Sequence, residues 1–544
     1  MTYDAIVIGA GHNGLVCACY LAKAGRRVLV LERREVVGGA CVTEEPWPGF
    51  KVSTAAYVNS LFRPQIAREL RLRDYGFELL ARNPSSFTPF LDERYLMLGP
   101  QGAANVREIG KFSRRDAERY PQYEAMLQRV AAIVEPTIDE APPDVLKPTL
   151  ADLKRLWMLQ RRLRNGASPA SIGEALEVLT GAARPILDRW FESEQLKGTL
   201  ATDAIIGAFA APSMPGTAYV LFHHVMGESD GVRGVWSYVR GGMGGLTQAL
   251  AAAARDLGVE IRTASEVGRI VVRGGAAVGV ALANGDEFSA KRIASNADCN
   301  VTFLKLLAED ALSPEIRAAI EKIDYSGASM KINLALDSLP AFTACAVSCR
   351  PERSERSERS RRSNESVGPE HRGTIHFCPD QDFIEHAYDD AKYGEPSREP
   401  VVEMTIPSSV DETLAPAGRH VASMFVQYAP YKLREGSWTQ ARRDEVADRC
   451  FTIVERYAPG FTSSVLHRQI LAPPDLEETF SLTGGNIFQG AMSLNQLFAF
   501  RPLPGYARYG TPVKDLYLCG SAAHPGGGVM GAAGRNAARE MLRR

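Results

Sequence analysis

The sequence predicts a mixed α/β protein (α+β overall) with a parallel α/β unit, a helical segment and a second, mixed sheet. Short apolar runs at 4–8 and 28–32 flank a helical pattern over 13–24, which is typical of a βαβ unit. The periodicity from 105 to 205 is helical, and the basic stretch at 154–164 within it is interpreted as a solvated helix face. Three apolar runs predict strands of the second sheet: 329–336, 401–406 and 421–428.

The composition is that of an ordinary soluble protein with more than one domain. The 544 residues are 45% hydrophobic and 23% charged, and two or three domains are expected. A net charge of −1 gives no support for a nucleic-acid partner. The nine cysteines form no CxxC pair, which indicates a reducing compartment and argues against dithiol chemistry. Without a leader or an apolar run of ~18 residues, a bacterial-type cytoplasmic location is expected, with peripheral membrane contact left open.

The first βαβ unit carries a dinucleotide-binding motif. Gly9, Gly11 and Gly14 form G-x-G-x-x-G between a strand and a helix, and Glu32 ends the next strand. Gly9 permits the tight turn, Gly11 admits a pyrophosphate, and Gly14 lets helix and strand pack closely. The helix N-terminus supplies free N–H groups to the phosphates, and Glu32 is expected to accept hydrogen bonds from a ribose.

Three further segments favour FAD over a nicotinamide dinucleotide. Gly38 and Gly39 follow Glu32 closely and allow the backbone to approach an elongated ligand. A small group of strands places the backbone of Val267 within reach of an adenine edge. Near the C-terminus, a strand ending at Gly520 leads through glycines to a helix predicted to start near Val529, whose N-terminus would stabilise a reduced isoalloxazine.

These segments resemble a known family. The first motif, "GGMGGL" at 241–246 and "LYLCGSAAHPGGGVMG" near the C-terminus are similar to the phytoene desaturase-like flavoprotein oxidoreductases. Within that group, the chain resembles the pyridine nucleotide-disulfide oxidoreductase domain-containing proteins. The resemblance covers nearly the whole chain except 350–363, which looks inserted. Because "GGMGGL" lacks a preceding strand and a spaced acid, we interpret it as a turn into a helix of the FAD domain.

The resemblance implies a glutathione reductase-like FAD-binding Rossmann domain that is discontinuous in sequence, with a mixed-sheet and helical substrate domain inserted. The FAD domain is predicted at 1–95, 228–300 and 501–544, and the substrate domain at 96–227 and 301–500. A low-complexity segment predicts a disordered loop at 350–370. Implied FAD contacts are Gly9, Gly11, Gly14, Glu32, Arg33, Gly38, Gly39, Val267, Gly520, Gly528, Val529 and Met530.

The implied activity is FAD-dependent dehydrogenation or desaturation of an apolar or amphipathic small molecule, with oxygen or quinone as electron acceptor. A flavin amine oxidase-like enzyme is the first alternative. A non-catalytic FAD-binding regulatory protein linked to mitochondrial or respiratory function, acting through a protein partner, is the second. For a eukaryotic-like relative, the mitochondrial matrix is the expected location. Cleft-lining segments are expected at 57–63, 211–226 and 484–500. His524 is the candidate catalytic residue, although a structural role is favoured for it, and no metal site is expected.

Overall fold

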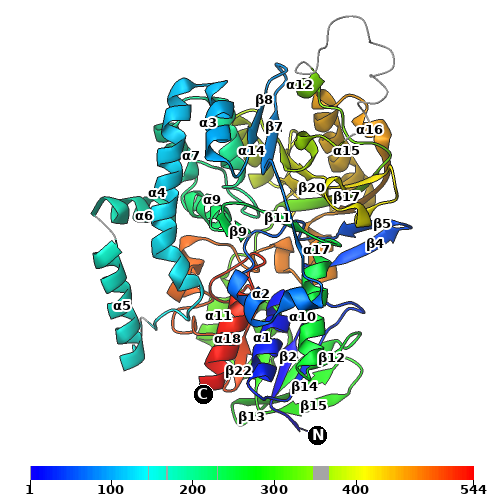
Figure 1. Cartoon of the computed structure of the whole chain (residues 1–544). Coiled ribbons are helices and arrows are strands. Elements are labelled where there is room, and N and C mark those ends of the chain that lie inside the picture. Colours follow the sequence, from blue (N-terminus) through cyan, green and yellow to red (C-terminus); the bar gives the residue numbers. More distant parts are fainter. Residues whose placement is uncertain are drawn as a thin grey trace, which may run out of the picture.

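The computed structural model describes residues 2–144, 146, 148–166, 169–229, 231–346 and 367–543. Two sheets organise them (Figure 1). The predicted loop at 350–370 lies outside the described residues except for 367–370. These last residues are ordered, because Pro369–His371 forms a short 3-10 helix and His371 Nε2 donates to the carbonyl of Pro340 at 3.0 Å. The prediction of disorder was therefore wrong for this end of the segment.

The first sheet is parallel and draws its strands from distant parts of the chain. In spatial order its strands are β12 (Glu260–Arg262), β3 (Val28–Leu31), β2 (Ala5–Ile8), β16 (Ile293–Ser295) and β22 (Leu516–Leu518). Four of the five strands are buried along their whole length, as their apolar runs predict. The α/β unit is thus discontinuous in sequence, as predicted.

Three helices cover this sheet: α1 (His12–Lys23), α10 (Gly244–Asp256) and α18 (Ala532–Arg543). The first helix packs against both of the others. A Cβ at Gly534 would lie 2.0 Å from the carbonyl oxygen of Asn13, so glycine is required for the close approach of α18 to α1. The "GGMGGL" segment leads into α10, which confirms that this motif is a turn into a helix of the first unit.

A four-stranded sheet adjoins the first α/β unit. It contains the small group of strands that the sequence predicts around Val267. In spatial order it consists of β1 (Thr2–Tyr3), β15 (Glu287–Ala290), β14 (Ala276–Leu282) and β13 (Val267–Arg273). Its last three strands are antiparallel, and β1 pairs with β15 in parallel.

The second large sheet is mixed, which confirms the prediction. In spatial order its strands are β21 (Val465–Leu471), β17 (Ser329–Leu336), β20 (His420–Gln427), β19 (Val401–Thr405), β18 (Thr374–Phe377), β7 (Ser86–Pro89) and β8 (Tyr95–Leu98). Only the pairing of β18 with β7 is parallel among those of the described strands in this sheet. The predicted domain limit at residue 95 is therefore misplaced, since Phe87 packs in the core of the second sheet through pairing with a strand far along the chain.

The segment between the sheets is helical, as its periodicity predicts. Its helices are α3 (Gly102–Gly110), α4 (Arg114–Ile138), α5 (Leu150–Gly166), α6 (Pro169–Thr180), α7 (Ala183–Trp190), α8 (Glu194–Thr202) and α9 (Thr217–Val225). Most of them pack in one hydrophobic core, and Met530 of the C-terminal turn belongs to the same core. Figure 1 shows α5 at the periphery of the molecule, apart from the helices around α4.

The remaining elements connect these layers. The short strands are β4 (Thr43–Trp47), β5 (Phe50–Ser53), β6 (Leu79–Ala81), β9 (Glu228–Ser229), β10 (Val232–Arg233) and β11 (Ser237–Val239). The other helices are α2 (Pro64–Glu69), α11 (Pro314–Glu321), α12 (Thr343–Ala346), α14 (Gln381–Lys392), α15 (Gln440–Tyr457), α16 (Phe461–Ser464) and α17 (Pro473–Phe480). No helix among the described residues is long and apolar enough to cross a bilayer.

Candidate functional site

One cavity of about 700 Å³ joins the first α/β unit to the second large sheet. At one end it is lined by the dinucleotide motif, and at the other by side chains from β17 and β20. Its volume falls in the usual range for ligand sites, about 300–1,000 Å³. Of the twelve predicted FAD contacts, nine line it: Gly9, Gly11, Glu32, Arg33, Gly38, Gly39, Val267, Gly528 and Val529.

The glycine motif forms the tight strand-to-helix turn that its sequence predicts. Gly9 has a φ of +91°, which favours glycine, and a Cβ at Gly14 would lie 2.2 Å from the carbonyl oxygen of Gly9. Gly14 therefore serves close packing and does not line the cavity. A Cβ at Gly11 would lie 2.7 Å from Nδ2 of Asn296, which itself lines the cavity. Gly11 is the N-cap of α1, so the free N–H groups of this helix terminus lie at the cavity wall.

Glu32 is buried at the end of β3 and is held by backbone amides. The Ala10 N–H donates to Oε2 at 2.7 Å, and the Arg34 N–H donates to Oε1 at 3.0 Å. Each carboxylate oxygen has a second lone pair, so Glu32 can accept further hydrogen bonds from a ligand in the cavity. The structure thus fixes the carboxylate on the turn where the motif predicts a ribose.

The loop after β3 lies against the dinucleotide motif. The Gly38 N–H donates to the carbonyl of Ala10 at 2.9 Å, and a Cβ at Gly39 would lie 3.4 Å from Cα of Gly11. The Arg33 guanidinium donates to the carbonyls of Glu478 and Thr479, at 2.9 and 2.8 Å. Arg33 therefore joins this end of the cavity to the last turn of α17.

The C-terminal glycine turn reaches the same cavity from the other end of the chain. Asn13 Nδ2 donates to Ser521 Oγ at 3.3 Å, and the His12 ring hydrogen-bonds to the backbone of Gly528. Gly528 has a φ of +100° and Gly531 a φ of +74°, values that a helix cannot contain. The helix predicted to start near Val529 therefore begins three residues later, at Ala532.

Besides Gly14, three predicted residues lie away from the cavity surface. A Cβ at Gly520 would lie 2.5 Å from the carbonyl oxygen of Asn296, so Gly520 permits a close backbone crossing. Met530 is buried in the helical core. His524 donates from Nε2 to the carbonyl of Thr137 at 2.8 Å, and burial lowers its pKa to about 4. His524 is thus hydrogen-bonded to the helical segment, away from the cavity lining.

Aromatic rings and a lysine line the far end of the cavity. The rings of Tyr57 and Phe425 are stacked with centroids 5.8 Å apart, and Nζ of Lys331 lies 4.4 Å from the centroid of Tyr57. Trp236 and Phe488 complete the aromatic surface. The predicted cleft segments contribute only in part: residues of 57–61 and 487–489 line the cavity, while the segment 211–226 supplies His224 alone.

Lys331 is buried on β17. It is the only lysine in the described strands of the second large sheet. Its Nζ donates to Ser423 Oγ, which in turn donates to Asn333 Oδ1 at 2.8 Å. Burial lowers the pKa of Lys331 well below its ordinary value, which favours the neutral amine. A neutral lysine amine in a cavity wall can accept a proton.

Tyr57 and Glu403 form a hydrogen-bonded pair of ionisable groups beside the aromatic surface of the cavity. The Tyr57 hydroxyl donates to Glu403 Oε2 at 3.3 Å, and Glu403 Oε1 lies 3.4 Å from Nδ1 of His376. Burial, and then the charge of Glu403, raise the pKa of Tyr57 well above its ordinary value. Tyr57 is therefore a neutral hydrogen-bond donor at physiological pH, with its ring fixed against the cavity.

Three contributions to the cavity were not predicted from the sequence. They are the lysine at Lys331, the amide at Asn296 and the ring of Tyr57 held in place by its hydrogen bond. One signal was available for the lysine: in "SMKINLAL", the charged residue sits in a strand that is otherwise suited to full burial. All eight residues of this strand are buried. Asn296 gave no such signal, because its role depends on the crossing of β16 and the dinucleotide motif.

The residues at the motif end fit a flavin dinucleotide. Nε2 of His12 and Oδ1 of Asn13 are buried at the cavity wall without a hydrogen-bond partner. Together with the free N–H groups of α1, they offer polar atoms where the pyrophosphate is expected. Cys41 lines the cavity, and burial raises its pKa to about 12, so thiolate chemistry finds no support there.

Comparison with known proteins gives the family. The family described as flavin containing amine oxidoreductase matches residues 14–542. Pyridine nucleotide-disulfide oxidoreductase domain-containing protein 2 of Mus musculus is 47% identical, over 99% of this chain and 93% of the mouse protein. Phytoene desaturase (lycopene-forming) of Pseudescherichia vulneris is 26% identical, over 97% of this chain and 96% of that enzyme.

The fold agrees with solved structures of the same kind. A structure of putrescine oxidase bound to putrescine superposes with a TM-score of 0.58 at 16% identity, covering 100% of both chains. This likeness shows the α/β fold with its second sheet. The match over nearly the full length and the high identity to the mouse protein lead to one conclusion: the chain belongs to the flavin-containing amine oxidoreductase family and is a flavin-dependent oxidoreductase.

Proposed function

We propose that the protein is an FAD-dependent dehydrogenase that oxidises or desaturates an apolar or amphipathic small molecule. The proposal rests on one observation: the same cavity extends from the dinucleotide motif to an end that is lined by aromatic and aliphatic side chains. A cofactor bound along the motif would thus share one continuous cavity with the substrate. The family and the phytoene desaturase relative support a reaction of this class.

Four groups of residues would hold the cofactor. The turn from Gly9 to Gly14 and the α1 terminus would bind the pyrophosphate, and Glu32 the adenosine ribose. The backbone at Val267 would meet the adenine, and Gly528 with Val529 the isoalloxazine. Bound FAD supplies the two-electron acceptor for the substrate hydride.

The far end of the cavity would orient the substrate and exclude water. Met330, Phe425 and Phe488 present apolar surface there, and the Tyr57 ring is fixed by its hydrogen bond to Glu403. Among the described lining residues, the carboxylates are Glu32 at the motif end, Glu266 next to Val267, and Glu477 and Glu478 on α17 beside Arg33. No lining carboxylate is therefore available near Lys331 to pair with a cationic substrate, which favours a neutral one.

Lys331 is the group that would take a proton during oxidation. Lys331 lines the cavity, burial lowers the pKa of its amine and so favours the neutral form, and Ser423 holds it in place. A substrate that loses a hydride next to an acidic C–H, O–H or N–H group could deliver that proton to Nζ. Oxygen or a quinone is the proposed electron acceptor.

Anaerobic reduction of the flavin tests the proposal. The purified protein would be mixed without oxygen with a panel of neutral lipids, terpenes and carotenoids, and with a matched panel of amines. Bleaching of the flavin band by a neutral apolar compound is the expected result. If no compound of either panel reduces the flavin while dithionite does, the protein is a non-catalytic flavoprotein and the proposal fails. Oxygen and quinones added to the reduced protein would then identify the acceptor.

Amine oxidation is the second candidate, and one observation favours it. The stacked rings of Tyr57 and Phe425, with Trp236 beside them, present aromatic faces to the same end of the cavity. Aromatic faces attract cationic amines. Bleaching by amines alone would select this reaction over oxidation of a neutral compound.

A further inference from the structure

Helix α5 turns its apolar residues toward the solvent. The exposed fractions are 86% for Leu150, 50% for Leu153 and 55% for Trp157, and Leu146 before the helix is 62% exposed. The spacing of three and four residues places Leu150, Leu153 and Trp157 along one side of the helix. These four residues are called the apolar stripe. A helix at the surface of a soluble domain normally has the opposite orientation.

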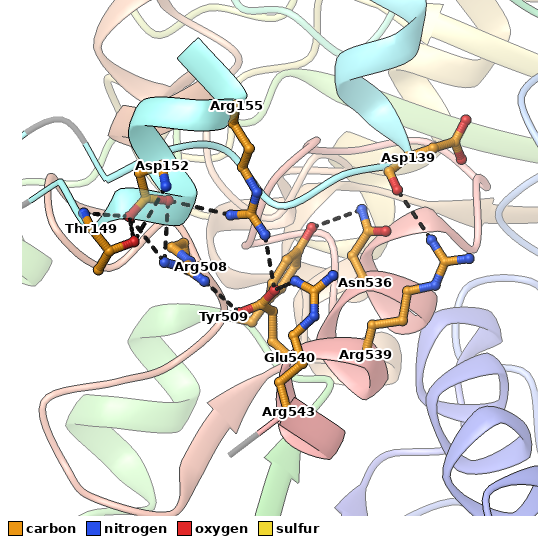
Figure 2. Close-up of polar contacts among 10 residues, drawn as sticks. All are labelled: Asp139, Thr149, Asp152, Arg155, Arg508, Tyr509, Asn536, Arg539, Glu540 and Arg543. Carbon is orange, nitrogen blue, oxygen red and sulfur yellow. Dashed lines mark hydrogen bonds and ion pairs between the residues drawn. The ribbon is translucent and has the colours of Figure 1, made fainter. Parts of the chain in front are cut away.

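Charged residues on the other side of α5 bind it to the first α/β unit (Figure 2). Asp152 is fully buried and accepts hydrogen bonds from the N–H and hydroxyl of Thr149, at 3.0 and 2.6 Å. Both of its oxygens lie 3.2 Å from Nη1 of Arg508. Burial alone would raise the pKa of Asp152, but Thr149 and the charge of Arg508 hold it below its ordinary value.

A second carboxylate completes this polar cluster on the C-terminal helix. Glu540 of α18 is 2% exposed and accepts from Arg508 Nη2 at 3.1 Å. Nη2 of Arg155 lies 3.6 Å from Glu540, and Arg543 pairs with the same carboxylate. Figure 2 shows Asp152 and Arg155 of α5 directed toward Arg508 and Glu540. Buried ion pairs of this kind fix orientation, since any rotation of α5 would leave charges unpaired.

The residues beside the apolar stripe are basic. Lys154 and Arg161 are exposed, and the Arg161 guanidinium lies 5.5 Å from the Trp157 ring centroid. Between Leu150 and Arg161 the only acid is the buried Asp152. The basic stretch was interpreted as a plain solvated face. The structure instead shows a mixed face on which leucines and a tryptophan are exposed among cations.

We propose that α5 is a docking surface for an anionic lipid bilayer. An exposed stripe of leucines and tryptophan flanked by lysine and arginine is what an interfacial helix presents to lipid headgroups. The tryptophan suits the headgroup boundary, and the cations attract a negatively charged leaflet. The ion pairs with α18 keep the stripe directed outward, so the helix would lie on the bilayer and the rest of the chain would stay outside it.

Charge argues against a second copy of this chain as the occupant. In a two-fold symmetric pair, each α5 would bring Lys154 and Arg161 toward the same residues of its mate. No exposed acid between Leu150 and Arg161 is available to compensate them. An anionic lipid surface satisfies the apolar and the basic residues together.

Vesicle sedimentation of the full chain tests the proposal. Vesicles of phosphatidylcholine alone would be compared with vesicles of phosphatidylcholine and phosphatidylglycerol in equal parts, at low and high salt. We expect sedimentation with the anionic vesicles and weaker binding as salt rises. Lys154→Gln with Arg161→Gln should weaken binding about 25-fold, since each cation near an anionic surface contributes about a fivefold factor.

Apolar variants separate lipid docking from simple charge attraction. Leu153→Gln with Trp157→Gln should weaken binding by about tenfold or more, because apolar side chains supply the insertion. Leu91→Gln is the matched control, because Leu91 is 64% exposed outside α5 and should leave binding unchanged. All these side chains are exposed, so circular dichroism and flavin content should not change.

Three results would overturn the proposal. The first is absence of binding to both kinds of vesicle, and the second is binding that the Leu153–Trp157 double variant leaves intact. The third is a dimer in sedimentation velocity that the same double variant converts to a monomer, because this would identify a second copy as the occupant. Quenching of tryptophan fluorescence by brominated lipid, lost in Trp157→Phe, would support insertion at the proposed helix.

Discussion

The backbone N–H of Ala10 donates to Oε2 of Glu32 at 2.7 Å, across the two strands that flank the dinucleotide motif. The carboxylate therefore stabilises the turn itself, in addition to any role toward a ribose. Glu32 and the motif form one unit, in which the acid at the end of β3 fixes the position of the glycine turn. Changes at Glu32 are expected to affect both the turn and the cofactor.

Replacing Glu32 with arginine should remove most of the bound flavin. A hydrogen bond to a charged group contributes about 1.5–3 kcal/mol, so the loss corresponds to at least about tenfold weaker binding. Flavin content per chain after purification and titration with FAD would measure it. Glu35→Arg, with the same charge change at an exposed position three residues later, should keep its flavin. Equal flavin content in both variants would contradict the placement of the site.

Gly14→Ala should destabilise the fold even without flavin. The new Cβ would lie 2.2 Å from the Gly9 carbonyl oxygen, so the turn and α1 must move apart. Overpacking of this kind costs about 1–3 kcal/mol or more, measurable as a lower midpoint of thermal unfolding. Gly173→Ala is the matched control: nothing lies within 4 Å of its Cβ on α6, and a stabilisation of about 0.5–1 kcal/mol is expected. A Gly14→Ala protein as stable as the wild type would be inconsistent with this geometry.

Much of the fold and of the motif end of the site could be predicted because local sequence determines them. Buried parallel strands need continuous apolar runs, and the turn at Gly9 and Gly14 admits only glycine, so both are visible in the sequence. The position of β7 could not be predicted, since its partner Thr374–Phe377 lies far along the chain. The start of α18 was placed too early because Gly531 adopts a positive φ that no local pattern shows.

Lys331→Met should increase stability, by an amount that depends on pH. In the unfolded chain the lysine is protonated below its ordinary pKa of 10.5, whereas the folded amine has a pKa well below this value. Folding therefore releases a proton, and the wild type loses stability as pH falls from 10.5 toward the lowered pKa. The variant lacks this term, so its advantage should grow by about 1.4 kcal/mol per pH unit within that window. Urea unfolding between about pH 8 and pH 10 would measure it.

A difference in stability that stays constant over this range would mean that the folded lysine remains charged. The same variant tests catalysis once a reducing substrate is known. Flavin reduction by the wild type should become faster as pH rises through the pKa of Lys331, and this dependence should disappear in Lys331→Met. Unchanged pH dependence would exclude Lys331 as the proton acceptor.

Asp152→Asn should loosen α5 and leave the rest of the fold intact. The substitution removes the charge that Arg508 and Arg155 bind, while the exposed apolar stripe gains no new partner. Hydrogen exchange over the described part of α5 should become faster, and exchange in α1 should stay unchanged. Glu118→Gln, at an exposed ion pair of α4, is the control and should alter neither helix. Slow exchange in α5 of the Asp152→Asn protein would show that other contacts hold the helix.

The substrate end and the orientation of α5 depend on tertiary contacts and could not be predicted. Lys331 became a candidate base only when β17 was found against Tyr57, a residue far earlier in the chain. The leucines of α5 have the spacing of a buried helix face, but they are exposed, because the ion pairs of Asp152 and Glu540 with Arg508 hold the opposite face against the first α/β unit. Lys331 in β17 and Asp152 in α5 are each a charged residue inside an apolar pattern. The pattern shows that the position is unusual but not what the residue does.

Both ends of the chain are proposed to form one FAD site, and the flavin content of the purified protein shows whether they do. We expect a yellow protein with absorbance near ~450 nm that releases FAD, and not FMN, at about one molecule per chain on denaturation. A colourless protein that takes up no flavin when FAD is added would contradict it.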